Sequence, residues 1–272
     1  MPTLPPERPS FDAPAPHEAR QVAESFGADP ARYDRTRPRY PEALVTRVLR
    51  ASPGSEVLDV GCGTGIGARQ FRAAGARVLG VEVDPRMARF ARRSELDVEV
   101  APFETWEAGG RTFDAVTAGQ TWHWIDPVAG AAKAARVLRP GGRLAAFWNM
   151  GQPPAALADA FAAVYERVLP EVPRPPRELS VRDMYAPIVS KVVEGIRGAC
   201  AFGEPEQWHY DHERAYTRDA WLDQLPTHGG HSGLPAERLA EFLAGVGEAI
   251  DAAGGGFTMR YTTVVVTAAR VR

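Results

Sequence analysis

The sequence predicts an α/β fold built on a doubly wound, mostly parallel sheet with a helical cap insertion. Three observations predict it. An apolar, β-branched run at 56–60 is cut off by Gly61, Gly63 and Gly65, and an amphipathic helical pattern follows. Short apolar runs then alternate with helical stretches up to residue 150, as in βαβ units. Proline-rich joints and amphipathic helices break this rhythm between 151 and 205, which indicates the cap.

The chain divides into four parts on this pattern. Residues 1–16 are rich in proline and are expected to form a disordered tail. Residues 17–150 form the ligand-binding core, 151–205 the cap, and 206–272 the C-terminal part of the core sheet. We expect strands at 56–60, 77–82, 97–101, 113–118, 143–148, 206–216 and 257–268, and helices near 155–169, 181–193 and 235–253.

Length and composition suit one α/β domain with an added cap. The 272 residues are 44% hydrophobic, enough for a buried core. A net charge of −2 gives no electrostatic case for a nucleic-acid partner, and no run approaches the length of a membrane span. Cys62 and Cys200 make no disulfide framework, and the N-terminus lacks the layout of a signal peptide. We therefore expect a cytoplasmic protein.

The glycine stretch is the first candidate ligand site. A strand, a glycine turn and a helix together present backbone N–H groups to a nucleotide-like ligand. Ile66 stands where a dinucleotide site has its third glycine, which disfavours a pyrophosphate cofactor. Asp59 lies just before the turn, and Glu82 ends the second strand at the offset where an acid takes up ribose hydroxyls.

The run V-L-D-V-G-C-G-T-G at 57–65, with G-V-E-V-D-P-R-M at 80–87, resembles the class I S-adenosylmethionine-dependent methyltransferases. The resemblance extends from about Phe26 to the C-terminus and looks closest to the bacterial branch similar to trans-aconitate methyltransferase, whose members act on small molecules. It implies a seven-stranded Rossmann-like core with an antiparallel C-terminal hairpin. It also implies that the core binds S-adenosyl-L-methionine, with S-adenosyl-L-homocysteine as the product.

The resemblance assigns cofactor contacts to matching positions. Segment 26–41, dense in Arg, Tyr and Pro, is either a solvated basic stretch or a clamp in which Tyr33 covers the cofactor and Arg37 faces its carboxylate, with Arg39 and Tyr40 as weaker choices. Phe103 and Glu104 match the positions that meet adenine, although Glu104 also suits an ordinary helix start. The implied cofactor residues are Tyr33, Arg37, Asp59, Gly61, Gly63, Gly65, Glu82, Val83, Met87, Phe103, Glu104, Gln120 and Thr121.

An aromatic loop, A-G-Q-T-W-H-W-I-D-P at 118–127, follows the fourth expected strand. His123 is the candidate general base, because its reference pKa lies near neutrality; a hydrogen-bonded structural role is the alternative. Trp122 and Trp124 are candidates for substrate contact, and their faces could stabilise the sulfonium cation. Packing between sheet and cap is the alternative for either residue. Further candidates for substrate contact come from the C-terminal part, namely Trp208, Trp221 and His228.

The predicted function is transfer of the sulfonium methyl group to an O, N or C nucleophile of a small molecule. Nucleobase methyltransferases usually carry Asn/Asp-Pro-Pro-aromatic after the fourth strand, where this chain has G-Q-T-W at 119–122. The alternatives are a non-methylating S-adenosylmethionine enzyme on the same fold, a cofactor-binding interaction protein and, more weakly, a nicotinamide oxidoreductase. We expect no metal site, because the histidines form no convincing ligand set. We also expect no nucleic-acid or membrane partner. The protein is expected to be a monomer or a homodimer.

Overall fold

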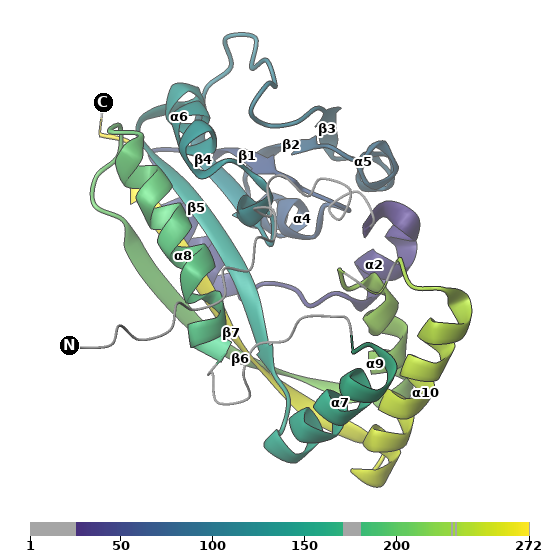
Figure 1. The fold of residues 1–272 in the computed structure, drawn as a ribbon. Coiled ribbons are helices and arrows are strands. Elements are labelled where there is room, and N and C mark those ends of the chain that lie inside the picture. The colour runs from purple at the N-terminus through teal and green to yellow at the C-terminus, as the bar shows by residue number, and fades with distance from the viewer. Residues whose placement is uncertain (1–25, 171–180, 230, 232, 272) are drawn as a thin grey trace, which may run out of the picture.

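The computed structural model describes residues 26–170, 181–229, 231 and 233–271. In this part of the chain seven strands form one sheet, in the order β3-β2-β1-β4-β5-β7-β6 (Figure 1). Strands β1 to β5 run parallel, whereas β7 pairs antiparallel with β5 and with β6, which confirms the predicted fold class. The strands are β1 (Glu56–Val60), β2 (Arg77–Glu82), β3 (Asp97–Val100), β4 (Phe113–Gly119), β5 (Leu138–Gln152), β6 (Glu206–Thr217) and β7 (Gly256–Ala269).

Helices cover both faces of the sheet and one of its ends (Figure 1). Side chains from α6 and α8 pack on one face, and side chains from α3, α4 and α5 pack on the other. The helices are α2 (Pro30–Thr36), α3 (Glu42–Arg50), α4 (Ile66–Ala73), α5 (Pro85–Arg92), α6 (Pro127–Val137), α7 (Ala155–Val168), α8 (Val181–Gly198), α9 (Arg218–Gln224) and α10 (Ala236–Ala252), with short 3-10 turns η2 (Phe26–Ala28), η3 (Trp122–Trp124) and η4 (Leu225–Thr227).

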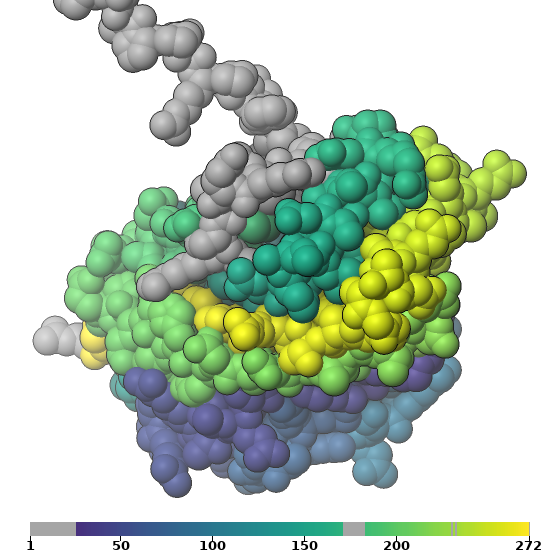
Figure 2. All heavy atoms as spheres, turned by 90° about the horizontal axis from the view of Figure 1, so that it is seen from below, coloured from purple at the N-terminus to yellow at the C-terminus, as the bar shows by residue number. Residues whose placement is uncertain are grey.

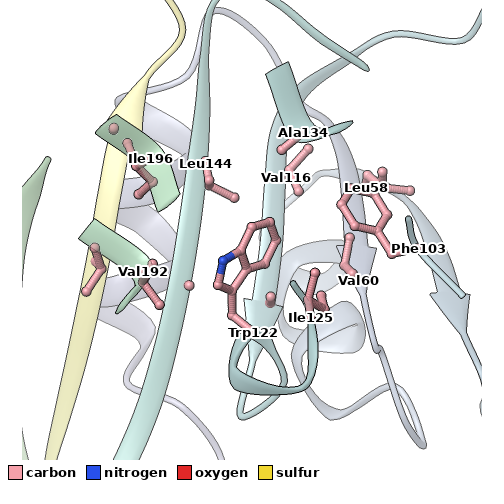
Figure 3. Close-up of a cluster of buried hydrophobic side chains, with 14 of the residues drawn as sticks. Leu58, Val60, Phe103, Val116, Trp122, Ile125, Ala134, Leu144, Val192 and Ile196 are labelled. Carbon is pink, nitrogen blue, oxygen red and sulfur yellow. The ribbon is translucent and has the colours of Figure 1, made fainter. Parts of the chain in front are cut away.

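Strand β5 shows how the sequence builds this two-sided core. Leu144 and Trp148 pack with Val192 of α8, whereas the intervening Ala145 and Phe147 pack toward α3. Because successive side chains of a strand point to opposite faces, a continuous apolar run is what a strand covered on both sides requires. Figure 3 shows the face on which α6 and α8 lie, with the indole of Trp122 at its centre.

A second layer of helices stands on the far end of the β5–β7–β6 ribbon. Helices α7, α9 and α10 bury Phe161, Trp221 and Phe242 against Tyr216 and Tyr261 of the two antiparallel strands. Figure 2 shows the teal spheres of α7 beside the yellow spheres of the C-terminal part of the chain. We call these three helices, together with the turn η4 that follows α9, the cap.

The stretch 151–205, which the sequence assigns to the cap, holds the end of β5 and the helices α7 and α8. Strand β5 runs to Gln152, beyond the expected end at 148, because it pairs with β7 as far as Arg260. Helix α7 then joins the cap, whereas α8 packs on α6 and the sheet. The division of the chain into four parts stays a prediction, and the expected tail at 1–16 lies outside the described residues.

Candidate functional site

One cavity of about 630 Å³ lies at the carboxyl ends of β1, β2 and β4 and extends beneath the cap. In the strand order, β1 lies between β2 and β4. The chain continues from β1 to β2 and β3 on one side and is then followed by β4 and β5 on the other side, so the strand order reverses at β1. Ligands of doubly wound sheets bind at such a switch point, in cavities of about this size. The predicted residues that line the cavity are Tyr33, Arg37, Gly61, Gly63, Glu82, Val83, Met87, Phe103, Glu104, Gln120, Thr121, His123, Trp124, Trp221 and His228.

The glycine turn presents bare backbone to the cavity. Gly61 and Gly63 have φ of +60° and +57°, in the left-handed region that favours glycine. The N–H of Gly61 donates to the carbonyl of Val81 over 2.7 Å, which ties the turn to β2. A Cβ on Gly61 would lie 2.1 Å from Cγ2 of Thr121, so the turn and the segment after β4 approach each other closely.

Glu82 is the buried acid of the cavity, with 7% of its surface exposed. Its Oε2 accepts from the N–H of Gly63 over 2.7 Å, and its Oε1 accepts from the N–H of Asp84 over 2.9 Å. Burial raises the pKa of this carboxyl above its usual range, while the backbone N–H groups of Asp84, Gly63 and Val83 act against that rise. Each oxygen keeps a lone pair that can accept from a hydroxyl of a ligand.

Asp59 and Gly65 do not line the cavity, which corrects their predicted contact with a cofactor. Asp59 accepts from the hydroxyl of Thr117 over 2.8 Å and from the N–H of Ala68, so it joins β1, β4 and α4 behind the turn. Gly65 caps α4 with φ of +86°, and a Cβ there would lie 2.4 Å from Leu96. Both residues shape the turn from its far side.

Burial gives Asp59 a testable effect on pH dependence, because it raises the pKa of this carboxyl to about 7. Between the unfolded value near 3.8 and 7, the folded chain binds a proton that the unfolded chain has lost. This group therefore stabilises the fold at low pH, and its contribution is lost as pH rises toward 7. Asp59→Asn mimics the protonated form, so its free energy of unfolding should exceed that of the wild type at pH 8. Urea unfolding at pH 8 and pH 5 measures the difference, which should shrink at pH 5; an equal difference would contradict the assignment.

Helix α2 forms a lid on the cavity through Tyr33 and Arg37. The guanidinium of Arg37 lies over the Tyr33 ring at 4.8 Å. Its Nε donates to the hydroxyl of Thr227 over 3.0 Å, and its Nη2 donates to the carbonyl of the same residue. The side chain thus joins the lid to η4 of the cap. The weaker candidates Arg39 and Tyr40 do not line the cavity. The ring of Tyr40 packs edge-on against Phe147, on the face of the sheet that α3 covers.

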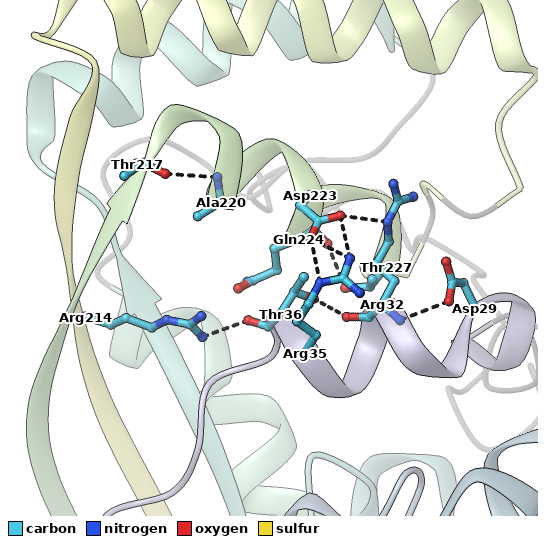
Figure 4. A network of polar contacts seen from close by, with 10 residues as sticks. All are labelled: Asp29, Arg32, Arg35, Thr36, Arg214, Thr217, Ala220, Asp223, Gln224 and Thr227. Carbon is cyan, nitrogen blue, oxygen red and sulfur yellow. Dashed lines mark hydrogen bonds and ion pairs between the residues drawn. The ribbon is translucent and has the colours of Figure 1, made fainter.

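A polar network reinforces this contact (Figure 4). The carboxylate of Asp223 on α9 accepts from Nε of Arg32 over 3.0 Å and from Nη2 of Arg35 over 2.7 Å. Nη1 of Arg214 on β6 donates to the carbonyl of Thr36 over 2.7 Å. Residues far apart in the sequence therefore hold α2 against the cap.

Asp223→Ala is expected to weaken binding of S-adenosylhomocysteine about 5- to 10-fold, because α2 loses two arginine contacts while the partly exposed pairs are individually weak. Titration calorimetry measures the dissociation constant. Asp219→Ala is the matched control, since Asp219 is exposed on the same helix and pairs with its neighbour Arg218. Equal affinities of the two variants would show that the network does not support the lid.

The aromatic loop divides its side chains between cavity and core. Trp124 lines the cavity beside Phe26 and His123, at ring distances of 6.3 and 4.7 Å. Trp122 does not line this cavity, which corrects its predicted contact with substrate. It is 1% exposed and packs against Phe103 in the core (Figure 3). The one-turn 3-10 helix η3 points the two indoles in different directions.

His123 is held by the neighbouring strand. Its Nδ1 accepts from the indole N–H of Trp148 on β5 over 3.1 Å. Burial lowers the pKa of His123 to about 4, so the ring is neutral at pH 7. Gln120, with φ of +58°, donates from Nε2 to the carbonyl of Asn149 over 3.2 Å, which fixes the same edge of the cavity.

A polar chain runs from β7 and β6 into the cap side of the cavity, and the sequence singled out only its last member, His228. Tyr261 and Tyr216 share a hydrogen bond of 2.8 Å, Tyr216 donates to Oε1 of Gln224 over 3.0 Å, and Nε2 of Gln224 lies 3.1 Å from Nε2 of His228. Tyr261, Gln224 and His228 line the cavity. Spacing was the available signal, since Gln224 stands between two cavity residues, three after Trp221 and four before His228.

Trp208 lies elsewhere, which corrects its predicted contact with substrate. Its ring packs on the opposite face of the sheet among residues of α3, with the guanidinium of Arg47 at 3.9 Å. Other cavity residues that the sequence did not single out include Phe26, Trp148, Asn149, Met184, Tyr185, Ile188 and Met259.

Within the described ranges, no group of three or more His, Cys, Asp or Glu is arranged to hold a metal ion. Among the helices of those same ranges, none combines the length and apolar character needed to span a bilayer.

Comparison with known proteins places this architecture among methyltransferases. Residues 58–146 match the model of a methyltransferase domain. An uncharacterized methyltransferase of Mycobacterium tuberculosis is 38% identical over 133 residues, which cover 48% of this chain and 54% of the relative. A malonyl-[acyl-carrier protein] O-methyltransferase of Hahella chejuensis is 34% identical over 134 residues, covering 46% and 48%. The matched region thus spans about half the length of these relatives.

A solved structure extends the likeness over most of the chain. A presumed type II methyltransferase from Anaeromyxobacter dehalogenans superposes with a TM-score of 0.63 and 26% identity, covering 86% of this chain and 98% of that one. This match covers more of the chain than the domain at 58–146 does. The placement in the branch similar to trans-aconitate methyltransferase stays a prediction.

Proposed function

We propose that this chain, which belongs to the class I S-adenosylmethionine-dependent methyltransferases, transfers a methyl group from S-adenosylmethionine to an O, N or C nucleophile of a small molecule. One observation carries the proposal: the glycine turn with Glu82 and the aromatic surface with the cap line a single cavity of about 630 Å³. A cofactor held at the turn and an acceptor held under the cap would therefore share one enclosed space.

The residues present fit the cofactor. A Cβ on Gly63 would meet nothing closer than Met87 at 4.0 Å, so the backbone beside Glu82 is open to the cavity. Glu82 would accept from the ribose hydroxyls, and Phe103 with Glu104 would flank the adenine. Arg37 would face the carboxylate with Nη1, because Nε and Nη2 already donate to Thr227.

The acceptor side is lined mainly by apolar and aromatic groups. Met184, Tyr185 and Ile188 of α8 face Trp221 of α9 and Met259 of β7 around the cavity. The Nε1 of Trp221 is buried and has no hydrogen-bond partner in the described part of the chain. These features support an acceptor with an apolar or aromatic body and few polar atoms.

S-adenosylmethionine, when bound, supplies an electrophilic methyl group on a positively charged sulfur. The chain would contribute by holding the acceptor beside that group, because alignment of two reactants can supply much of a rate enhancement. The aromatic faces of Tyr33 and Trp124, which line the cavity, would exclude water and stabilise positive charge. The lid and cap close the space by the contacts of Arg37 and Asp223.

Two measurements test the proposal. S-adenosylhomocysteine should raise the melting temperature, and protein incubated with methyl-labelled S-adenosylmethionine and a metabolite extract should yield a labelled small molecule. Absence of any melting shift would refute the cofactor assignment. A shift without methylated product would favour a non-methylating enzyme or an interaction protein instead. The cytoplasmic location and the monomeric or homodimeric state stay predictions.

A further inference from the structure

We propose that Trp148 fixes His123 in the neutral tautomer with its proton on Nε2, so that His123 donates a hydrogen bond to the methyl acceptor and does not take its proton. The inference rests on the proposed methyl transfer. It replaces the general base that the sequence suggested with a different role for the same side chain.

The identity of the donor decides the tautomer. An indole N–H can only donate, so Nδ1 of His123, 3.1 Å away, must be the unprotonated nitrogen. A neutral imidazole then carries its single proton on Nε2. Trp148 is fully buried on β5, between β4 and β7, at the wall of the main cavity, and its N–H donates to His123.

The protonated nitrogen is turned away from the sheet. The two nitrogens of an imidazole point in nearly opposite directions, and Nδ1 faces β5. Nε2 has no hydrogen-bond partner among the residues that the structure describes, while His123 lines the main cavity. It also borders a smaller cavity of about 150 Å³ beside α8, lined by Ile188 and Lys191. A ligand atom in the main cavity can therefore accept from Nε2.

The surrounding charges do not prepare His123 to take a proton. In an acid–base triad a carboxylate accepts from the imidazole, whereas the acids on neighbouring elements are engaged elsewhere here. Glu104 accepts from the N–H of Asp126, and Asp126 caps α6. Lys191 of α8 brings a positive charge to the smaller cavity. A proton on Nδ1 would also place two donors against each other. Burial of the ring independently lowers the pKa of His123.

The consequence concerns the class of acceptor. It must present a lone pair without help from His123, as an oxyanion or an uncharged amine does. That lone pair forms the bond to the methyl carbon, the C–S electron pair stays on sulfur, and any proton still on the acceptor leaves to water. The Nε2–H bonds to the nucleophilic atom or to an oxygen beside it, and so orients the acceptor.

The tautomer can be observed directly. Long-range ¹H–¹⁵N spectra of ¹⁵N-labelled protein with S-adenosylhomocysteine at pH 7 should show His123 unprotonated at Nδ1 and protonated at Nε2, with its signals assigned by their loss in His123→Gln. Trp148→Phe removes the N–H and keeps a ring, so the second tautomer should appear. A wild-type proton on Nδ1, or an unchanged tautomer in Trp148→Phe, would overturn the proposal.

A matched pair of variants tests the chemical role. His123→Gln places an amide N–H near the position of Nε2 but cannot act as a base, whereas His123→Phe offers neither. With labelled S-adenosylmethionine and the metabolite extract, the first should keep about a tenth or more of the labelled product, and the second should lose about 100-fold. Equal losses would overturn the donor role.

Failure of this inference is distinguishable from failure of the proposed function. A melting shift with S-adenosylhomocysteine, measured for each variant, shows that the variant is folded and binds the cofactor. Wild-type protein without that shift and without product would refute methyl transfer itself. A wild type that binds and methylates, with variants that break the expected pattern, would refute only the assignment of His123 and Trp148.

Discussion

Glu82→Gln is expected to weaken binding of S-adenosylhomocysteine by about 100-fold and to leave the chain folded. The carboxylate already accepts one backbone N–H on each oxygen, over 2.7 and 2.9 Å, and would accept the ribose hydroxyls with the remaining lone pairs. Hydrogen bonds to a charged group contribute about 1.5–3 kcal/mol each. An amide nitrogen at either position cannot accept, and it also faces a backbone donor.

Titration calorimetry measures the affinity, and circular dichroism with thermal melting reports the fold. Glu248→Gln on the exposed side of α10 removes the same charge away from the cavity and should bind like the wild type. Glu82→Ala would lose the same hydroxyl contacts but also free the N–H groups of Gly63 and Asp84, so its stability should fall further than that of Glu82→Gln. Unchanged affinity in Glu82→Gln would place the ribose elsewhere.

The parts of the site that the sequence predicted belong to short contiguous motifs. The glycine turn needs residues tolerant of positive φ immediately after a buried strand, and Gly61 and Gly63 satisfy this locally. Glu82 ends the adjacent parallel strand, and parallel pairing of β1 with β2 brings it to the turn. Local conformation and strand pairing together therefore place these groups without knowledge of the remaining fold.

The predictions for Trp208 and Asp59 were wrong because the sequence pattern did not define the direction in which each side chain points. Alternation predicts that Trp208 shares a face with Tyr210, yet it does not say which face of the sheet that is. The pairing of β6 with β7 assigns Trp208 to the side of α3. For Asp59, proximity to the turn in sequence suggested contact with a ligand, whereas its side chain points to Thr117 and the start of α4.

On the cap side of the cavity the sequence predicted Trp221 and His228, but it could not predict the residues whose position depends on distant pairings. Asn149 lies in the extension of β5, and its carbonyl binds Gln120, some thirty residues earlier. Tyr261 reaches the cavity because β7 pairs with that extension as far as Gln152. Strand length set by a partner more than a hundred residues away leaves no local signature.

Gly61→Ala and Gly63→Ala form a second pair of tests. The first variant is expected to lose more stability, and the second is expected to lose affinity for the cofactor. Both residues have φ near +60°, so alanine costs about 1–2 kcal/mol at either position from backbone strain. Only at Gly61 does the new methyl group meet a neighbour, Cγ2 of Thr121 at 2.1 Å. Gly61→Ala should therefore be less stable than Gly63→Ala by about 1–3 kcal/mol.

The affinity for S-adenosylhomocysteine should fall more in Gly63→Ala than in Gly61→Ala. At Gly63 the new methyl group would have no neighbour nearer than Met87 at 4.0 Å. Because Gly63 and Met87 line the cavity, this methyl group would occupy space beside Glu82 that the cofactor needs. Gly63→Ala should then lose at least about 10-fold in affinity for S-adenosylhomocysteine, since the backbone can no longer approach the ligand. Calorimetry and urea unfolding on the same preparations give both quantities.

The clash at Gly61 has its own control. Thr121→Ser removes Cγ2 but keeps the hydroxyl that donates to the carbonyls of Gly61 and Gly119, each over 3.0 Å. In the Gly61→Ala background this second change should restore part of the lost stability, whereas in the Gly63→Ala background it should restore none, because contacting residues couple and separated ones add. Equal effects of Thr121→Ser in the two backgrounds would show that the turn relaxes away from Thr121, and that its tight contact with the segment after β4 does not hold the cavity in shape.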